Sequence, residues 1–106
     1  MNSQSIGIFD SGIGGLTVAN AISSVLPNEH IVYFGDSEHM PYGEKSPELI
    51  QEFAVKITNY LIEEKNCKAV VIACNTASAV AYIHLKKVYE GRVPIINVID
   101  PMIELV

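Results

Sequence analysis

Short apolar runs alternate along the chain with longer segments of helical period. Four runs rich in β-branched and aromatic residues are the expected strands: residues 5–9 (SIGIF), 31–35 (IVYFG), 68–74 (KAVVIAC) and 93–99 (VPIINVI). The connections between them are short and helical, so each strand–helix–strand unit should be a right-handed crossover. The pattern predicts an α/β fold, with a doubly wound parallel four-stranded sheet flanked by helices on both faces.

Three helices are expected between these strands, each with an apolar face. The first, over residues 16–26, follows Gly14 and Gly15, and its expected inward side chains are Leu16, Ala19, Ile22, Ser23 and Leu26. The second begins at Ser46 and Pro47, an N-cap followed by proline, and should bury Leu49, Ile50, Phe53, Ile57, Tyr60 and Leu61. The third follows Cys74, ends at Gly91, and should bury Ala77, Val80, Ala81, Val88 and the ring of His84.

Composition narrows the class of protein. The 106 residues are 49% hydrophobic, enough for one domain with one core. Twelve acidic against seven basic residues give a net charge of −5, which argues against nucleic acid as a partner. Two cysteines make neither a disulfide scaffold nor a zinc motif. Without a basic leader or a long apolar run, we expect a cytoplasmic protein that does not enter a membrane.

The C-terminal end suggests that the sequence is a fragment. Asp100 and Pro101 have the pattern of a helix start, yet the sequence stops at Val106. We therefore expect residues 1–106 to form one domain of a longer chain.

The segment after the first strand is rich in glycine. Asp10 and Ser11 are followed by Gly12, Gly14 and Gly15, which can turn tightly and present backbone amides to an anion at a helix N-terminus. An equally good interpretation is that the glycines only make the turn and Asp10 caps the helix. Nucleotide binding is a weaker alternative, because Thr17 replaces the third glycine of the dinucleotide motif, although Asp36 ends the second strand.

Two further strand ends carry candidate chemistry. After the second strand, Pro41, Tyr42 and Gly43 could form a rigid turn with ligand-binding amides, or only a surface loop. After the third strand, Cys74 stands at a helix N-terminus, where partial positive charge favours the thiolate. Cys67, before that strand, is expected to be an inert core residue. None of His30, His39 and His84 has the pattern of a partner for a catalytic thiol.

Taken in order, DSGIGG (10–15), PYG (41–43) and CNTAS (74–78) resemble the glutamate racemase family of the aspartate/glutamate racemase superfamily. The resemblance covers the chain from Ile6 to about Pro101. It implies a cofactor-independent enzyme of two pseudo-symmetric domains, in which one cysteine from each half faces the substrate α-carbon. It also implies a role in supplying D-glutamate for peptidoglycan, and hence in cell-wall biogenesis and cell shape.

The resemblance assigns roles to residues of this chain. Cys74 would be the first catalytic thiol, and Asp10 the carboxylate that assists it. The expected contacts to the amino acid come from Asp10, Ser11, Asn75 and Thr76, and the backbone clamp on a carboxylate from Pro41, Tyr42 and Gly43.

The second cysteine of the pair is missing from this sequence. Cys67 and Cys74 should lie roughly 20 Å apart along the third strand, too far to serve one α-carbon. The resemblance places the second thiol in a C-terminal domain, so this chain alone should not racemise glutamate at a normal rate. Three alternatives stay open: a binding or interaction module without catalysis, a single-cysteine decarboxylase of the same superfamily, and a homodimer that brings two Cys74 thiols together.

Overall fold

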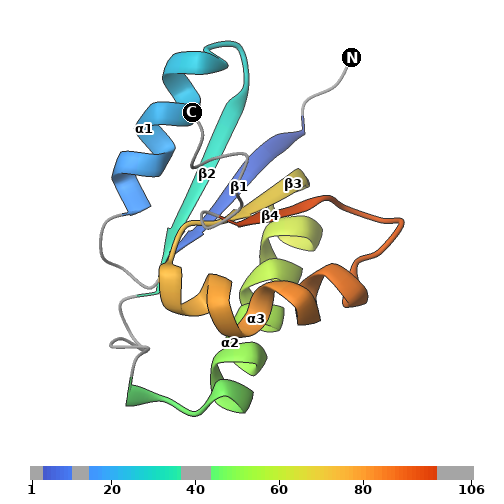
Figure 1. The fold of residues 1–106 in the computed structure, drawn as a ribbon. Coiled ribbons are helices and arrows are strands. Elements are labelled where there is room, and N and C mark those ends of the chain that lie inside the picture. The colour runs from blue at the N-terminus through green and yellow to red at the C-terminus, as the bar shows by residue number, and fades with distance from the viewer. Residues whose placement is uncertain (1–3, 11–14, 37–43, 98–106) are drawn as a thin grey trace.

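The structure is a computed structural model that describes residues 4–10, 15–36 and 44–97, with the backbone alone for residues 15–17 and Asn75. Strands and helices alternate along the chain (Figure 1). The elements are β1 (Ser5–Asp10), α1 (Gly15–Val25), β2 (His30–Gly35), α2 (Pro47–Asn59), the π-helical turn η3 (Tyr60–Glu64), β3 (Cys67–Ile72), α3 (Asn75–Val88) and β4 (Ile95–Asn97). The start of a helix expected at Asp100 lies outside the described residues.

The four strands form one sheet in the order β2-β1-β3-β4, and every neighbouring pair is parallel. In its central register, Ile8 of β1 lies opposite both Tyr33 of β2 and Val71 of β3. The predicted parallel sheet is confirmed. Parallel pairing brings the carboxyl ends of all four strands to the same edge, where ligands of open α/β sheets bind.

Helices cover both faces of the sheet (Figure 1). On one face α1 packs over β1 and β2, and the buried side chains there are Ile8, Ala19 and Val71. On the other face α2 and α3 pack side by side over a larger core that includes Phe9, Leu61 and Val70. Neighbouring strand residues thus alternate between the two cores, which confirms the doubly wound arrangement.

The predicted helix boundaries agree closely with the structure. The Leu49 N–H donates a hydrogen bond to Ser46 Oγ at 3.1 Å, so Ser46 is the N-cap of α2, with Pro47 as its first residue. After α3, Gly91 adopts a φ of 77°, a left-handed conformation that favours glycine. No helix among the described residues is long and apolar enough to cross a membrane.

The predicted inward face was wrong in part for the first two helices. Ser23 and Leu26 are exposed, because α1 ends at Val25 and turns Ala19 and Ile22 toward the sheet. In α2 and η3 the buried stripe consists of Ile50, Ala54, Ile57, Thr58 and Leu61. Leu49 and Tyr60 flank this stripe and are exposed, and the Tyr60 ring packs edge-on against Phe34 instead.

The third helix also needs a correction. Ala77, Ala81 and Leu85, four residues apart, are fully buried, so this row faces the sheet. His84 was predicted to be packed on the apolar side, but it is exposed. It precedes Leu85 by one position, which turns it about 100° around the helix, and Val88 is likewise exposed on the flank.

Candidate active site

Three strand ends meet at the carboxyl edge of the sheet. Asp10 is the last residue of β1, Asp36 follows β2, and Cys74 follows β3 by two residues. The Asp36 N–H donates to the Asp10 carbonyl oxygen at 2.8 Å, and the Ala73 N–H donates to the Phe9 carbonyl oxygen at 2.7 Å. These backbone bonds place Asp10 between the other two chain segments, at the edge that the sequence predicted for the site.

Cys74 is the N-cap residue of α3. Its backbone is extended, with φ −104° and ψ 126°, and its carbonyl oxygen accepts from the Ser78 N–H at 2.8 Å. The residue is 8% exposed and lies at the positive end of the helix dipole. A thiol at the end of a strand and the start of a helix is the arrangement that the sequence predicted for a catalytic base.

The neighbours of Cys74 on α3 differ in how far they are described. Thr76 is half-buried in the first turn, while only the backbone of Asn75 is described. Ser78 is buried, and its hydroxyl donates to the Ile72 carbonyl oxygen at 3.2 Å. This hydrogen bond satisfies the carbonyl group of the last residue of β3 and links the first turn of α3 to the strand.

Asp10 is fully buried and accepts a hydrogen bond from Tyr33. The Tyr33 hydroxyl lies 2.8 Å from Asp10 Oδ2. Burial, this hydrogen bond and the charge of Asp10 together raise the pKa of Tyr33 from 10.0 to about 12. Tyr33 was not among the site residues predicted from the sequence. The available signal was its place on the same face as Asp10 once the two strands are paired in parallel.

Cys67 stands at the opposite end of β3 from Cys74, as expected. It is 2% exposed, and burial raises the pKa of its thiol. Its Sγ would lie 3.0 Å from a Cβ added at Gly7. Cys67 is therefore a close-packed core thiol, remote from the carboxyl edge of the sheet.

Several predicted site residues lie outside the described residues: Ser11, Pro41, Tyr42 and Gly43, together with Gly12, Gly14 and His39. Their proposed roles remain predictions. Among the described residues, no group of three or more His, Cys, Asp or Glu side chains is arranged to hold a metal ion.

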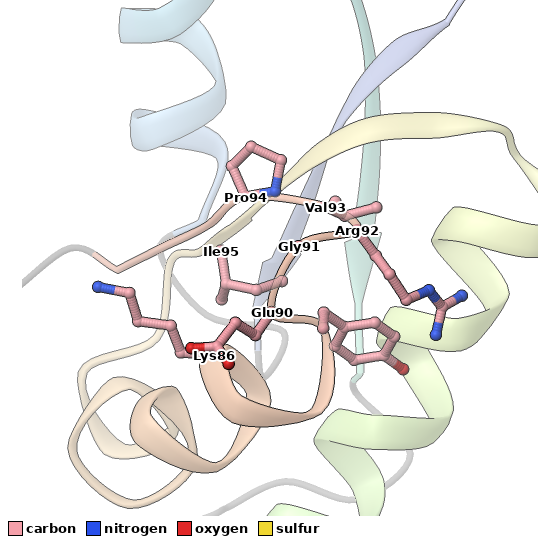
Figure 2. Close-up of a pocket in the computed structure, with 8 residues that line it drawn as sticks. Lys86, Glu90, Gly91, Arg92, Val93, Pro94 and Ile95 are labelled. Atoms are coloured by element: carbon pink, nitrogen blue, oxygen red, sulfur yellow. The ribbon is translucent and has the colours of Figure 1, made fainter.

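A shallow hollow of about 470 Å³ lies at the other end of the domain, where α3 leads into β4 (Figure 2). Lys86 and the stretch from Tyr89 to Ile95 line it. The Arg92 side chain points from this corner toward the end of α2, where it pairs with Glu63 of η3 at 3.3 Å. The hollow lies at the amino edge of the sheet and takes no part in the site around Cys74.

Comparisons with known proteins agree on one family, although no protein-family model matches the chain. Glutamate racemase 2 of Caldanaerobacter subterraneus is 56% identical over 79 residues, which are 74% of this chain and 30% of that protein. The crystal structure of the Francisella tularensis glutamate racemase with D-glutamate superposes with a TM-score of 0.86 at 45% identity, covering 100% of this chain and 40% of that one. The Thermus thermophilus glutamate racemase also gives 0.86, at 42% identity, over 93% of this chain and 38% of that one.

The sheet order and the thiol and carboxylate at its carboxyl edge, together with these matches, define an α/β domain of the amino-acid racemase class. More particularly, the chain belongs to the glutamate racemase family. It spans about 30% to 40% of the length of the relatives that it matches. The family resemblance indicated by the three motifs is thus confirmed.

Proposed function

We propose that this chain supplies one half of an active site that interconverts L- and D-glutamate without a cofactor. The observation that carries the proposal is the position of Cys74, a buried thiol at the N-terminus of α3 and at the same sheet edge as the buried carboxylate of Asp10. A racemase needs a base that is little hydrated and electrostatically poised, because the α-proton of an amino acid is a weak acid.

In this proposal the Cys74 thiolate removes the α-proton and becomes a thiol, while the electron pair of the C–H bond stays on the α-carbon. A second thiol then protonates the opposite face, and the reverse reaction exchanges the two roles. Asp10 assists transfer at Cys74, and Ser11, Asn75 and Thr76 hold the ammonium and α-carboxylate. Pro41, Tyr42 and Gly43 bind a carboxylate through their backbone.

The second thiol would come from the C-terminal domain of the parent chain. A second copy of this chain is the alternative source, and a strictly monomeric sedimentation profile of the 106-residue chain would exclude it. On either route the chain alone, as a monomer, should not complete racemisation.

Two solved relatives support the substrate. The Francisella tularensis glutamate racemase was crystallised in complex with D-glutamate, and the Escherichia coli glutamate racemase in complex with L-glutamate. Binding of both enantiomers is what one site that inverts the α-carbon requires. The proposal extends to a cytoplasmic enzyme that supplies D-glutamate for peptidoglycan.

The test compares two thiol variants of the full-length protein, Cys74→Ala and Cys67→Ala. Circular dichroism follows the racemisation of each glutamate enantiomer, and proton NMR follows exchange of the α-proton with D₂O. Cys74→Ala should abolish racemisation, whereas Cys67→Ala should keep it, because Cys67 only packs in the core. Full activity in the Cys74→Ala protein would refute the proposal.

A further inference from the structure

The side chain of Tyr33 meets Asp10 across two neighbouring strands. Tyr33 lies opposite Ile8 in the parallel register, and Asp10 points to the same face of the sheet as Ile8 because it is two residues further along β1. The phenol therefore reaches one step toward the carboxyl edge, where it donates to Asp10 Oδ2 at 2.8 Å. Asp10 is fully buried, so protein groups rather than bulk water orient its carboxylate.

Packing alone does not require this hydroxyl. The ring of Tyr33 packs against the core under α1, which includes Ile8 and Val71, and a phenylalanine would fill the same space. What the hydroxyl adds is a directed, charge-assisted hydrogen bond to one oxygen of one carboxylate.

The Tyr33 phenol also keeps its proton at neutral pH. The pKa of Tyr33 is raised to about 12. Tyr33 is therefore a hydrogen-bond donor to Asp10, and not a proton acceptor, at neutral pH.

We propose that Tyr33 is a positioning residue, whose hydroxyl holds the Asp10 carboxylate in the orientation from which it assists proton transfer at Cys74. The inference rests on the proposed racemase function and on the role of Asp10 in it. In this inference Tyr33 acts through Asp10, so its removal should slow one of the two proton transfers and leave glutamate binding largely intact.

The first experiment is Tyr33→Phe in the full-length protein. We expect kcat to fall about tenfold, the typical effect of losing one hydrogen bond to a charged group, with KM changed by less than about twofold. In an Asp10→Asn background the same substitution should lower kcat no further, because the carboxylate that Tyr33 orients is already gone.

A kinetic isotope effect separates positioning from a general structural defect. The enantiomers have equal free energies, so kcat/KM must fall equally in both directions. The kinetic isotope effect measured with α-deuterated glutamate should instead differ between the two enantiomers. It should rise for the enantiomer whose proton Cys74 removes, because that step becomes more rate-limiting. It should fall toward unity for the other enantiomer, because return of a solvent-derived proton from Cys74 then limits the rate.

Tyr89→Phe is the matched control, since it also deletes a hydrogen bond from a tyrosine hydroxyl to a side-chain oxygen, that of Asn59, far from Cys74. It should leave kcat and both isotope effects unchanged. A Tyr33→Phe enzyme with wild-type kcat overturns the inference, and so does a slowed enzyme whose two isotope effects do not diverge. A wild-type protein that does not racemise glutamate refutes the proposed function itself, which is a different and recognisable result.

Discussion

Gly7 of β1 is a position where the structure predicts the cost of a single methyl group. A Cβ added there would lie 3.0 Å from Cys67 Sγ, and 3.2 and 3.4 Å from Cδ1 and Cβ of Leu61. All three atoms belong to the buried core under α2 and η3, where neighbours have little room to move. Gly7→Ala should therefore destabilise the domain by overpacking.

The size of the effect follows from two opposing terms. Overpacking a close-packed core costs about 1–3 kcal/mol, whereas alanine in place of glycine inside a strand gains about 0.5–1 kcal/mol. The net loss should be about 0.5–2 kcal/mol, or roughly 4–8 °C in Tm for each kcal/mol in a domain of this size. Urea unfolding of the chain followed by circular dichroism measures it.

A second substitution tests the cause. Cys67→Ala removes the sulfur nearest the new methyl, so the double variant Gly7→Ala/Cys67→Ala should lose less stability than the sum of the two single variants. Gly91→Ala is the control: nothing lies within 4 Å of its added Cβ, and its cost comes from the φ of 77°. It should add to Cys67→Ala without coupling. Overpacking at Gly7 is excluded if Gly7→Ala is as stable as the unsubstituted protein, or if its cycle with Cys67→Ala is additive within about 0.5 kcal/mol.

Three smaller perturbations test other contacts. Ser46→Ala removes the N-cap bond to the Leu49 N–H and should lower stability by about 1 kcal/mol in thermal melts. The folded-state pKa of Tyr33 lies above its ordinary value, so the stability that this tyrosine contributes is fully present below pH 10 and should be lost as the pH rises from 10.0 to about 12. Urea unfolding at several pH values measures this loss, which should be absent in Tyr33→Phe. Glu29→Gln breaks the half-exposed Lys68–Glu29 pair and should cost less than about 1 kcal/mol, and nothing measurable in high salt.

The parts of the fold that local pattern determines could be predicted from the sequence. Apolar runs marked the strands, Ser46 and Pro47 marked the start of α2, and the short crossovers required a parallel sheet. The position of Cys74 at a strand end and a helix start followed from the same pattern.

The details that depend on tertiary register could not be predicted in the same way. Rotation of α3 about its axis exposes His84 and buries Leu85, and both choices are compatible with the apolar pattern of the helix. The bond between Tyr33 and Asp10 joins residues 23 positions apart, and only the pairing of β1 with β2 brings them together. The sequence around either residue holds no local signal for such a contact.

The corner between α3 and β4 is tied to α2 and η3 by two side-chain links. Tyr89 donates to Asn59, and Arg92 pairs with Glu63, while the Arg92 and Val93 N–H groups donate to the Tyr89 carbonyl oxygen. An exposed turn normally exchanges its amide hydrogens through local fraying. Because the buried Tyr89 side chain anchors this turn to α2, exchange of the Arg92 and Val93 amides should be slower than in a free turn, and it should speed up in Tyr89→Phe.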